Sequence, residues 1–304
     1  MQPLNICRDA EPHIELVVVE HQRPADQIIR LRDGRARREH DRGRDQISHA
    51  RKLARAVVLP ALAAALIAAC HDDVAEVDGA FYDGDGRLVH CAIDLDTEAN
   101  NSEASVDTGL DRARDRGEVV ELYTHHPGVT VPIEKIEHVL AGAKARGLSF
   151  VTYGDYARGQ YQKGTPGLAL SFDDTFVEAW VALRPLFQQY GARITFFVSH
   201  YISLSEEAHQ GLETLAADGH DIEAHTVLHL RGPDYVENLG LAAYLDNEVD
   251  PSIKVLRDAG FDTNAFAYPY GARTSETDRA IGKRVPVIRS VSFTYTIIES
   301  PCPH

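Results

Sequence analysis

Helix-forming segments that end at a glycine alternate with short apolar segments along most of this chain. The helical segments cover residues 104–116, 133–146, 176–190, 206–218 and 241–259. The apolar segments, each the length of one strand, cover residues 118–123, 148–153, 168–172, 193–198, 221–224, 265–268 and 285–292. Glycine directly after a helix closes it in a left-handed conformation, and strands that alternate with helices pair in parallel through crossover connections. The sequence therefore predicts one large α/β domain, for which 304 residues suffice.

A hairpin is predicted before these units begin. Residues 79–82 and 87–93 are strand-like and flank Asp83-Gly84-Asp85-Gly86. Asp-Gly pairs between two such segments are a strong signal for a tight turn between antiparallel strands.

The net charge of −15 is unevenly distributed. Residues 1–56 hold 12 of the 31 basic side chains and 9 of the 46 acidic ones, and residues 57–69 hold none, so the chain from residue 70 onward carries −18. An acidic body of this kind argues against binding to nucleic acid or other polyanions. A neutral or locally cationic substrate is expected.

The N-terminal 70 residues resemble an extension followed by an export signal. Residues 1–50 lack a sustained pattern and are expected to be disordered or a misassigned translation start. A basic patch at 51–55 and an uncharged segment at 56–69 then lead to Ile67-Ala68-Ala69-Cys70, which resembles a bacterial lipobox. We expect residues 51–70 to be a lipoprotein signal peptide, with Cys70 lipidated and the protein at the periplasm or cell surface. A buried Ala-rich helix is the alternative.

The remaining cysteines suit an exported protein. Cys91 and Cys302 can pair in an oxidising compartment, and two separate buried thiols are an equal alternative from the sequence alone.

Two groups of metal-binding residue types follow predicted strands. Asp173 and Asp174 end the apolar segment 168–172, and neighbouring strand residues point to opposite sides, so one carboxylate can bind a metal while the other handles a proton. His225 and His229 follow the segment 221–224, and two histidines with one carboxylate are a usual ligand set for catalytic zinc. The alternatives are a helix cap for the aspartates and lone surface histidines.

Tyr268-Pro269-Tyr270-Gly271 forms a third group at a strand end, where a turn can present a backbone N–H or simply be lined by aromatic rings. Together with Ser171-Phe172-Asp173-Asp174 and the His225–His229 segment, in this order, it resembles the polysaccharide deacetylases (the NodB homology domain, carbohydrate esterase family 4). The resemblance implies a distorted, TIM-like (β/α) barrel with a divalent metal, most often zinc and in some members cobalt or another ion. It also implies hydrolysis of N- or O-acetyl groups on a glycan.

The family's Leu-x-x-His motif is expected near the C-terminus, but here Leu122-Tyr123-Thr124-His125 precedes the Asp-Asp strand. We therefore expect a circularly permuted barrel over residues 71–304, in which 79–160 supply the usual C-terminal part and 167–304 the N-terminal part. Barrel termini lie close together, so this rearrangement is physically easy. It requires the strands at 118–123 and 168–172 to be neighbours.

The resemblance also implies a role for each site residue. Asp174, His225 and His229 would bind the metal, and Asp173 would be the general base. His125 would be the general acid, with His126 as the alternative, and an acidic residue, Asp94 or Asp96, would tune it. The backbone N–H of Tyr270 would help to hold the oxyanion.

Two positions depart from the family pattern. Ala267 stands where the family has the arginine that orients the base, so Arg273 or Arg289 must substitute or the base is less finely tuned. Thr175 stands where glycine is usual. Two alternatives to a deacetylase therefore stay open: a surface-tethered glycan-binding protein without turnover, and an amidase for a small non-sugar amide.

Overall fold

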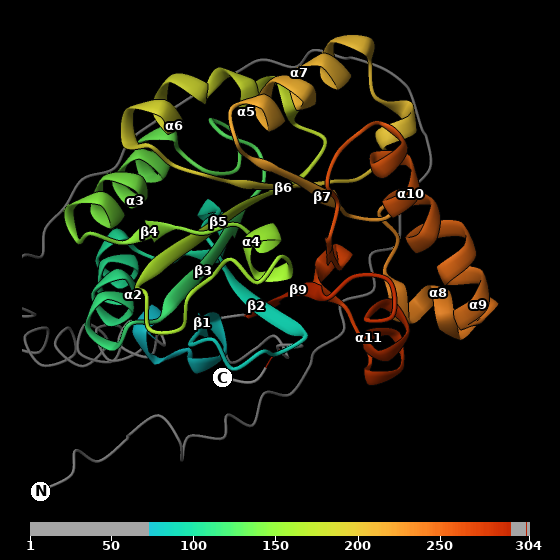
Figure 1. Cartoon of the computed structure of the whole chain (residues 1–304), viewed down its shortest axis with the longest axis horizontal. Coiled ribbons are helices and arrows are strands. Elements are labelled where there is room, and N and C mark those ends of the chain that lie inside the picture. The colour runs from blue at the N-terminus through green and yellow to red at the C-terminus, as the bar shows by residue number, and fades with distance from the viewer. Residues whose placement is uncertain (1–72, 293–301, 303–304) are drawn as a thin grey trace, which may run out of the picture. The chain divides into compact units, whose positions relative to one another are not determined.

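The computed structural model describes residues 73–292 and 302, which belong to one compact unit (Figure 1). The extension 1–50, the signal 51–70 and Cys70 lie outside the described residues. Within the described part of the chain, no helix has both the length and the apolar character needed to cross a bilayer.

Seven parallel strands close into a barrel, which confirms the predicted α/β barrel (Figure 1). Each strand pairs with the next in the order β3-β2-β9-β8-β7-β6-β5, and β5 returns to β3. The strands are β2 (Val89–Asp94), β3 (Val119–Thr124), β5 (Gly167–Asp174), β6 (Thr195–Val198), β7 (Asp221–Ala224), β8 (Ala265–Ala267) and β9 (Val287–Ser292). The pairing of β3 with β5 is the adjacency that a permuted chain order requires.

The predicted hairpin is wrong. Strand β1 (Phe81–Tyr82) pairs antiparallel with β3, and β2 lies between β3 and β9 with parallel partners on both sides. Because β2 is almost entirely buried, its backbone groups need partners at both edges, and a two-residue hairpin partner does not supply them. A second short strand, β4 (Ser149–Phe150), pairs with the start of β5.

Helices cover the barrel and follow most strands. They are α2 (Glu103–Arg116), α3 (Ile133–Ala145), α4 (Tyr153–Ala157), α5 (Val177–Ala182), α6 (Arg184–Tyr190), α7 (Glu206–Ala217), α8 (Gly232–Leu239), α9 (Leu241–Tyr244), α10 (Asp250–Asp258) and α11 (Ser275–Ile281). Shorter turns are η1 (Val74–Glu76), η2 (Asp78–Ala80), η3 (Thr97–Ala99), η4 (Tyr201–Ser203), the π-helical η5 (Leu245–Val249) and η6 (Pro269–Gly271).

Two predicted helices are divided in the structure. The segment 176–190 breaks between α5 and α6, and 241–259 breaks at η5 before α10. A proline lies in the first turn of both α6 and α10, and proline has no N–H to continue the preceding helix.

Alternate residues of β5 face two different layers. Leu168, Leu170 and Phe172 pack into the core between strands and helices, whereas Ala169 belongs to a second cluster inside the barrel. Tyr153 of α4 joins that second cluster beside the first residues of several strands, so it fills the barrel at their N-terminal ends. The C-terminal ends of the strands are thereby left for polar side chains.

Cys91 of β2 forms a disulfide with Cys302, with a Cα–Cα distance of 6.0 Å. Of the two alternatives that the sequence left open, a disulfide or two separate thiols, the structure has the disulfide.

Candidate active site

The residues singled out in the sequence meet at the C-terminal ends of the barrel strands. A cavity of about 300 Å³ lies there. Its lining residues are Tyr123, His125, Asp173, Asp174, His225, His229, Tyr270, Gly271, Arg289 and Val291. Parallel strands bring their carboxyl ends to one edge of the barrel, which is why residues more than 160 positions apart share this cavity.

Asp174, His225 and His229 form a group that can hold one metal ion. Oδ1 of Asp174 lies 3.2 Å from Nε2 of His229 and 3.7 Å from Nε2 of His225. One ligand atom from each residue falls within 4.8 Å of the others. Two imidazoles and one carboxylate suit a catalytic divalent metal such as zinc, with positions left for water.

His225 is held in the form that a metal requires. Its Nδ1 lies 2.9 Å from the carbonyl oxygen of Ala267, and because a carbonyl only accepts, Nδ1–H donates this bond. The lone pair of Nε2 therefore faces Asp174 and His229. Burial, with the neighbouring His229 as a further cause, holds the pKa of His225 well below its ordinary value, so this imidazole is neutral.

Left-handed backbone conformations occur at two candidate metal ligands and at the residue that follows His225. Asp174 has φ of 86°, Thr226 of 66° and His229 of 56°, all unusual outside glycine. Thr175, the position where the family usually has glycine, is not among the residues with positive φ, because Asp174 makes the turn. Threonine at 175 therefore introduces no left-handed strain.

Arg289 makes the contact to Asp173 that was expected of an arginine at position 267, where this chain has alanine. Its Nη2 donates to Oδ2 of Asp173, and both side chains are almost completely buried. Ala267 and Arg289 are register partners on β8 and β9, so the small alanine leaves room beside the guanidinium. Arg273, the other candidate, pairs with Asp278 instead.

Two aromatic rings flank the Arg289 guanidinium. Its Cζ lies 5.0 Å from the ring centroid of Tyr123 and 5.0 Å from that of Phe197. Such contacts hold a desolvated cation in one orientation.

The carboxyl group of Asp173 is poised between opposing influences. Burial raises its pKa above the ordinary value, while the charges of Arg289 and of His125 act in the opposite direction. Oδ2 is occupied by Arg289, and the buried Oδ1 has no hydrogen-bond partner among the described residues. Oδ1 is thus the atom that can take a proton from a water molecule.

His125 is paired with Asp96. Nδ1 of His125 lies 2.6 Å from Oδ2 of Asp96, whose other oxygen accepts from the His125 backbone N–H at 3.3 Å. Burial alone would lower the pKa of His125, but the hydrogen bond to Asp96 and the charge of Asp173 outweigh it and raise the pKa to about 9. The ring is therefore protonated at neutral pH.

Asp94, the other acidic candidate, hydrogen-bonds Tyr123. Its Oδ2 accepts from the Tyr123 hydroxyl at 3.2 Å, and burial, together with the charge of Asp96, raises its pKa to about 6. Of the two acidic candidates, Asp96 is the one that hydrogen-bonds His125.

His126 does not line the cavity that contains His125. Its ring stacks on Phe176 with centroids 4.2 Å apart and lines a neighbouring cavity that includes Thr175. The geometry therefore favours His125 over His126 as the acid.

Tyr270 lies at the rim of the cavity, with φ of 58° and a side chain that is 62% exposed. Its ring centroid is 4.8 Å from that of His229. The aromatic side chain therefore covers one edge of the candidate metal site.

The sequence offered Arg289 only as one of two substitutes, and it gave no sign of Tyr123 or Phe197 as its flanking rings. One signal was present. Val287, Arg289 and Val291 share one face of β9, so a charged residue stands between two valines on the same buried face of the strand.

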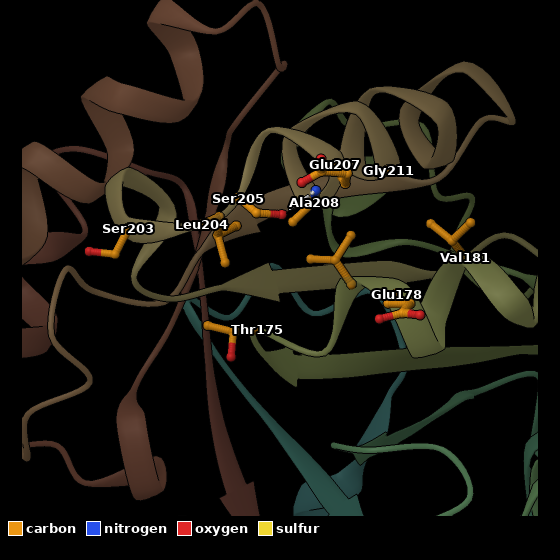
Figure 2. A pocket seen from close by; sticks show the side chains of 10 residues that line it. Thr175, Glu178, Val181, Ser203, Leu204, Ser205, Glu207, Ala208 and Gly211 are labelled. Carbon is orange, nitrogen blue, oxygen red and sulfur yellow. Dashed lines mark hydrogen bonds between the residues drawn. The ribbon is translucent and has the colours of Figure 1, made fainter.

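A second hollow, of about 430 Å³, lies between α5 and α7 (Figure 2). It begins at Thr175, directly after Asp174, and Figure 2 shows Glu178, Ser203, Ser205 and Glu207 around it. Apart from Thr175, no residue singled out in the sequence lines this hollow.

Comparison with known proteins supports the resemblance. Residues 160–286 match the family model described as polysaccharide deacetylase. A gellan lyase from Bacillus sp. is 34% identical over 112 residues, which are 36% of this chain and only 4% of that protein. The chain therefore corresponds to a small fraction of that relative's length.

Solved structures similar to this chain include deacetylases, each at low identity. The deacetylase PplD of Streptococcus pyogenes, in complex with acetate, is 18% identical, covers 58% of this chain and 92% of its own, and has a TM-score of 0.44. IcaB from Ammonifex degensii is 18% identical, covers 58% of this chain and 85% of its own, and has a TM-score of 0.46. The chitin deacetylase of Colletotrichum lindemuthianum is 22% identical, covers 40% of this chain and 54% of its own, and has a TM-score of 0.34.

The matched segment contains Asp173, Asp174, His225, His229 and Tyr270, whereas His125 and Arg289 lie outside it. The resemblance drawn from the sequence is confirmed over residues 160–286, which match the polysaccharide deacetylase family model.

Proposed function

We propose that this protein is a metal-dependent hydrolase that removes N- or O-acetyl groups from a polysaccharide. One observation carries the proposal. A metal-ligand triad, a carboxylate held by a buried arginine and a histidine protonated at neutral pH line the same cavity of about 300 Å³. These are the parts that hydrolysis of an amide or ester requires.

Asp174, His225 and His229 would hold the metal, which, when bound, supplies a Lewis acid for the acetyl carbonyl and lowers the pKa of water. Asp173 accepts the proton of the attacking water at Oδ1, while Arg289 fixes the carboxylate through Oδ2. His125 donates its proton to the leaving nitrogen or oxygen, and Asp96 keeps the ring oriented. The Tyr270 backbone N–H is the proposed donor to the oxyanion.

The presence of Arg289 weighs against the non-catalytic alternative. That alternative rested on the missing arginine at Ala267, and the guanidinium from β9 supplies the same contact to Asp173. A pure glycan-binding protein has no need for a buried pair at this position.

The circular permutation remains part of the proposal. Six consecutive residue pairs, from Val119 with Gly167 to Thr124 with Phe172, join β3 to β5, as a permuted order requires. His125 follows β3, so the acid enters the site from the segment that precedes the Asp-Asp strand in this chain.

We also propose that the protein is exported and anchored through a lipid on Cys70. The disulfide between Cys91 and Cys302 supports an oxidising compartment. Incorporation of labelled fatty acid in the native host, lost in Cys70→Ala, tests the anchor.

The activity is tested by acetate release from a panel of acetylated oligosaccharides, with small non-sugar amides in parallel. Protein that begins after residue 70 is stripped with a chelator and then supplied with zinc, cobalt or nothing. We expect metal-dependent release from at least one glycan. Turnover of the small amides alone would favour the amidase, and tight metal binding without any turnover would favour the binding protein.

A further inference from the structure

We propose that Glu248 is a positioning residue for the metal site, an inference that rests on the proposed metal-dependent function. Its Oε2 accepts hydrogen bonds from the backbone N–H of Val227 at 3.1 Å and of Leu228 at 2.8 Å. These two peptide groups lie between the metal-binding candidates His225 and His229. Glu248 is about 20 residues away in the sequence and touches neither imidazole through these bonds.

The burial of Glu248 makes these bonds strong. The residue is only 1% exposed and forms no ion pair among the described residues, and its Oε2 accepts both backbone hydrogen bonds in a site that is shielded from water. Inside a protein the low local dielectric makes hydrogen bonds such as these electrostatically stronger than in water. A buried polar side chain is costly unless it is hydrogen-bonded, and the partners of Glu248 are the two peptide groups of the loop.

The loop that Glu248 holds needs such support. Thr226 and His229 both have left-handed backbones, a strained conformation for residues other than glycine. Oγ of Thr226 accepts from the His229 backbone N–H at 3.0 Å, which secures one end of the loop. The middle of the loop is secured by Glu248. Without it the loop would relax, and His229 would leave the position in which its Nε2 faces Asp174.

The local helix geometry presents Glu248 to the loop. It lies in η5, the π-helical turn between α9 and α10, in the part of the chain that the structure describes. Such turns insert one extra residue into a helix and are frequent at functional sites. The neighbouring Val249 is buried in the main core, so the wider turn lets adjacent residues serve the core and the loop.

The experiment measures zinc affinity of the metal-stripped protein by competition with a chelator. It also records the visible spectrum of the cobalt-loaded protein and urea unfolding of the metal-free protein. Glu248→Met removes the oxygen that accepts both bonds while keeping a side chain of similar length, and Glu248→Gln keeps a carbonyl oxygen as an acceptor. The matched control is Glu223→Met, because Glu223 is also buried and accepts two backbone N–H groups, from Asn264 and Ala265, each at 2.7 Å.

We expect Glu248→Met to weaken zinc binding about 10- to 100-fold, the usual effect of losing a group that orients ligands. The cobalt spectrum should change, and Glu248→Gln should recover most of the affinity. Glu223→Met should lower the stability of the metal-free protein but leave zinc affinity and the cobalt spectrum as in the wild type.

Equal zinc affinity in Glu248→Met and wild type would overturn the inference, as would an equal loss in Glu223→Met. If Glu248→Met does not fold, Glu248→Asp is the deciding variant, because it keeps the carboxyl group but withdraws it from the loop by one methylene. Unchanged zinc affinity in Glu248→Asp would overturn the inference, and a loss is the expected result. Failure of the wild type itself to bind zinc or cobalt is a separate result, which would overturn the proposed metal-dependent function.

Discussion

The Arg289–Asp173 pair allows the most quantitative prediction. Arg289 is 1% exposed and Asp173 is 2% exposed, so Arg289→Met leaves a buried carboxylate without its partner. Removing one member of a buried ion pair costs about 3–5 kcal/mol, because the remaining charge is uncompensated. We therefore expect the free energy of unfolding to fall by about 4 kcal/mol. Arg289→Met/Asp173→Asn should recover most of this loss, because no buried charge remains.

The same substitution should change the pH dependence of activity. Arg289 opposes the effect of burial on the pKa of Asp173, so its loss raises that pKa further. The base is then protonated over a wider range, and the acid limb of the kcat/KM profile should move to higher pH. Urea unfolding and acetate release between pH 5 and 9 measure both effects. A stability loss below about 1 kcal/mol, with an unshifted acid limb, would refute the assignment of Arg289 to the base.

Exchanging the two register partners provides the control. Ala267→Arg alone should destabilise the barrel by about 1–3 kcal/mol or more, because it places a second large side chain beside Arg289. Ala267→Arg/Arg289→Ala returns the guanidinium to the family position, and it should be both more stable and more active than Arg289→Ala. An exchange no better than Arg289→Ala would show that the position on β9 itself is required.

Two further predictions concern the His125–Asp96 pair and the disulfide between Cys91 and Cys302. In metal-free protein, the His125 pKa of about 9 lies above the ordinary value of 6.5, so its contribution to stability is complete below pH 6.5 and lost as pH rises through 9. That contribution is about 3 kcal/mol, and His125→Gln should flatten the decline in stability with rising pH that chemical denaturation measures. Asp96→Asn should move the alkaline limb of the activity profile to lower pH. Unchanged pH profiles in both variants would contradict the pairing of His125 with Asp96. Replacing Cys91 and Cys302 by alanine should lower stability by about 3–5 kcal/mol, because the disulfide closes a loop of 211 residues, and urea unfolding equal to the wild type would contradict this.

The barrel could be predicted because its signals are local. Helices ending at glycine and strands ending in aspartate or histidine are visible within a few residues of sequence, and parallel topology then places the strand ends together. The partners of β1 were mispredicted, because Asp83–Gly86 is a strong local turn signal that a long-range pairing with β3 overrides.

The residues that act on the site from a distance could not be assigned in the same way. Arg289 reaches Asp173 across 116 positions, and the choice between Arg273 and Arg289 depends on the register of β8 with β9. The choice of Asp96 over Asp94 likewise depends on a side-chain contact to His125 that spacing does not encode.

The most direct test of the account is acetate release measured against the amount of metal bound. Metal-free protein is titrated with zinc in the presence of an acetylated oligosaccharide that the wild type turns over, beside Asp174→Ala as the matched variant. We predict activity that rises with zinc, saturates at one ion per chain and is absent in Asp174→Ala, which keeps the wild-type fold by circular dichroism. Full activity in chelated protein, or activity retained in folded Asp174→Ala, would contradict the central claim.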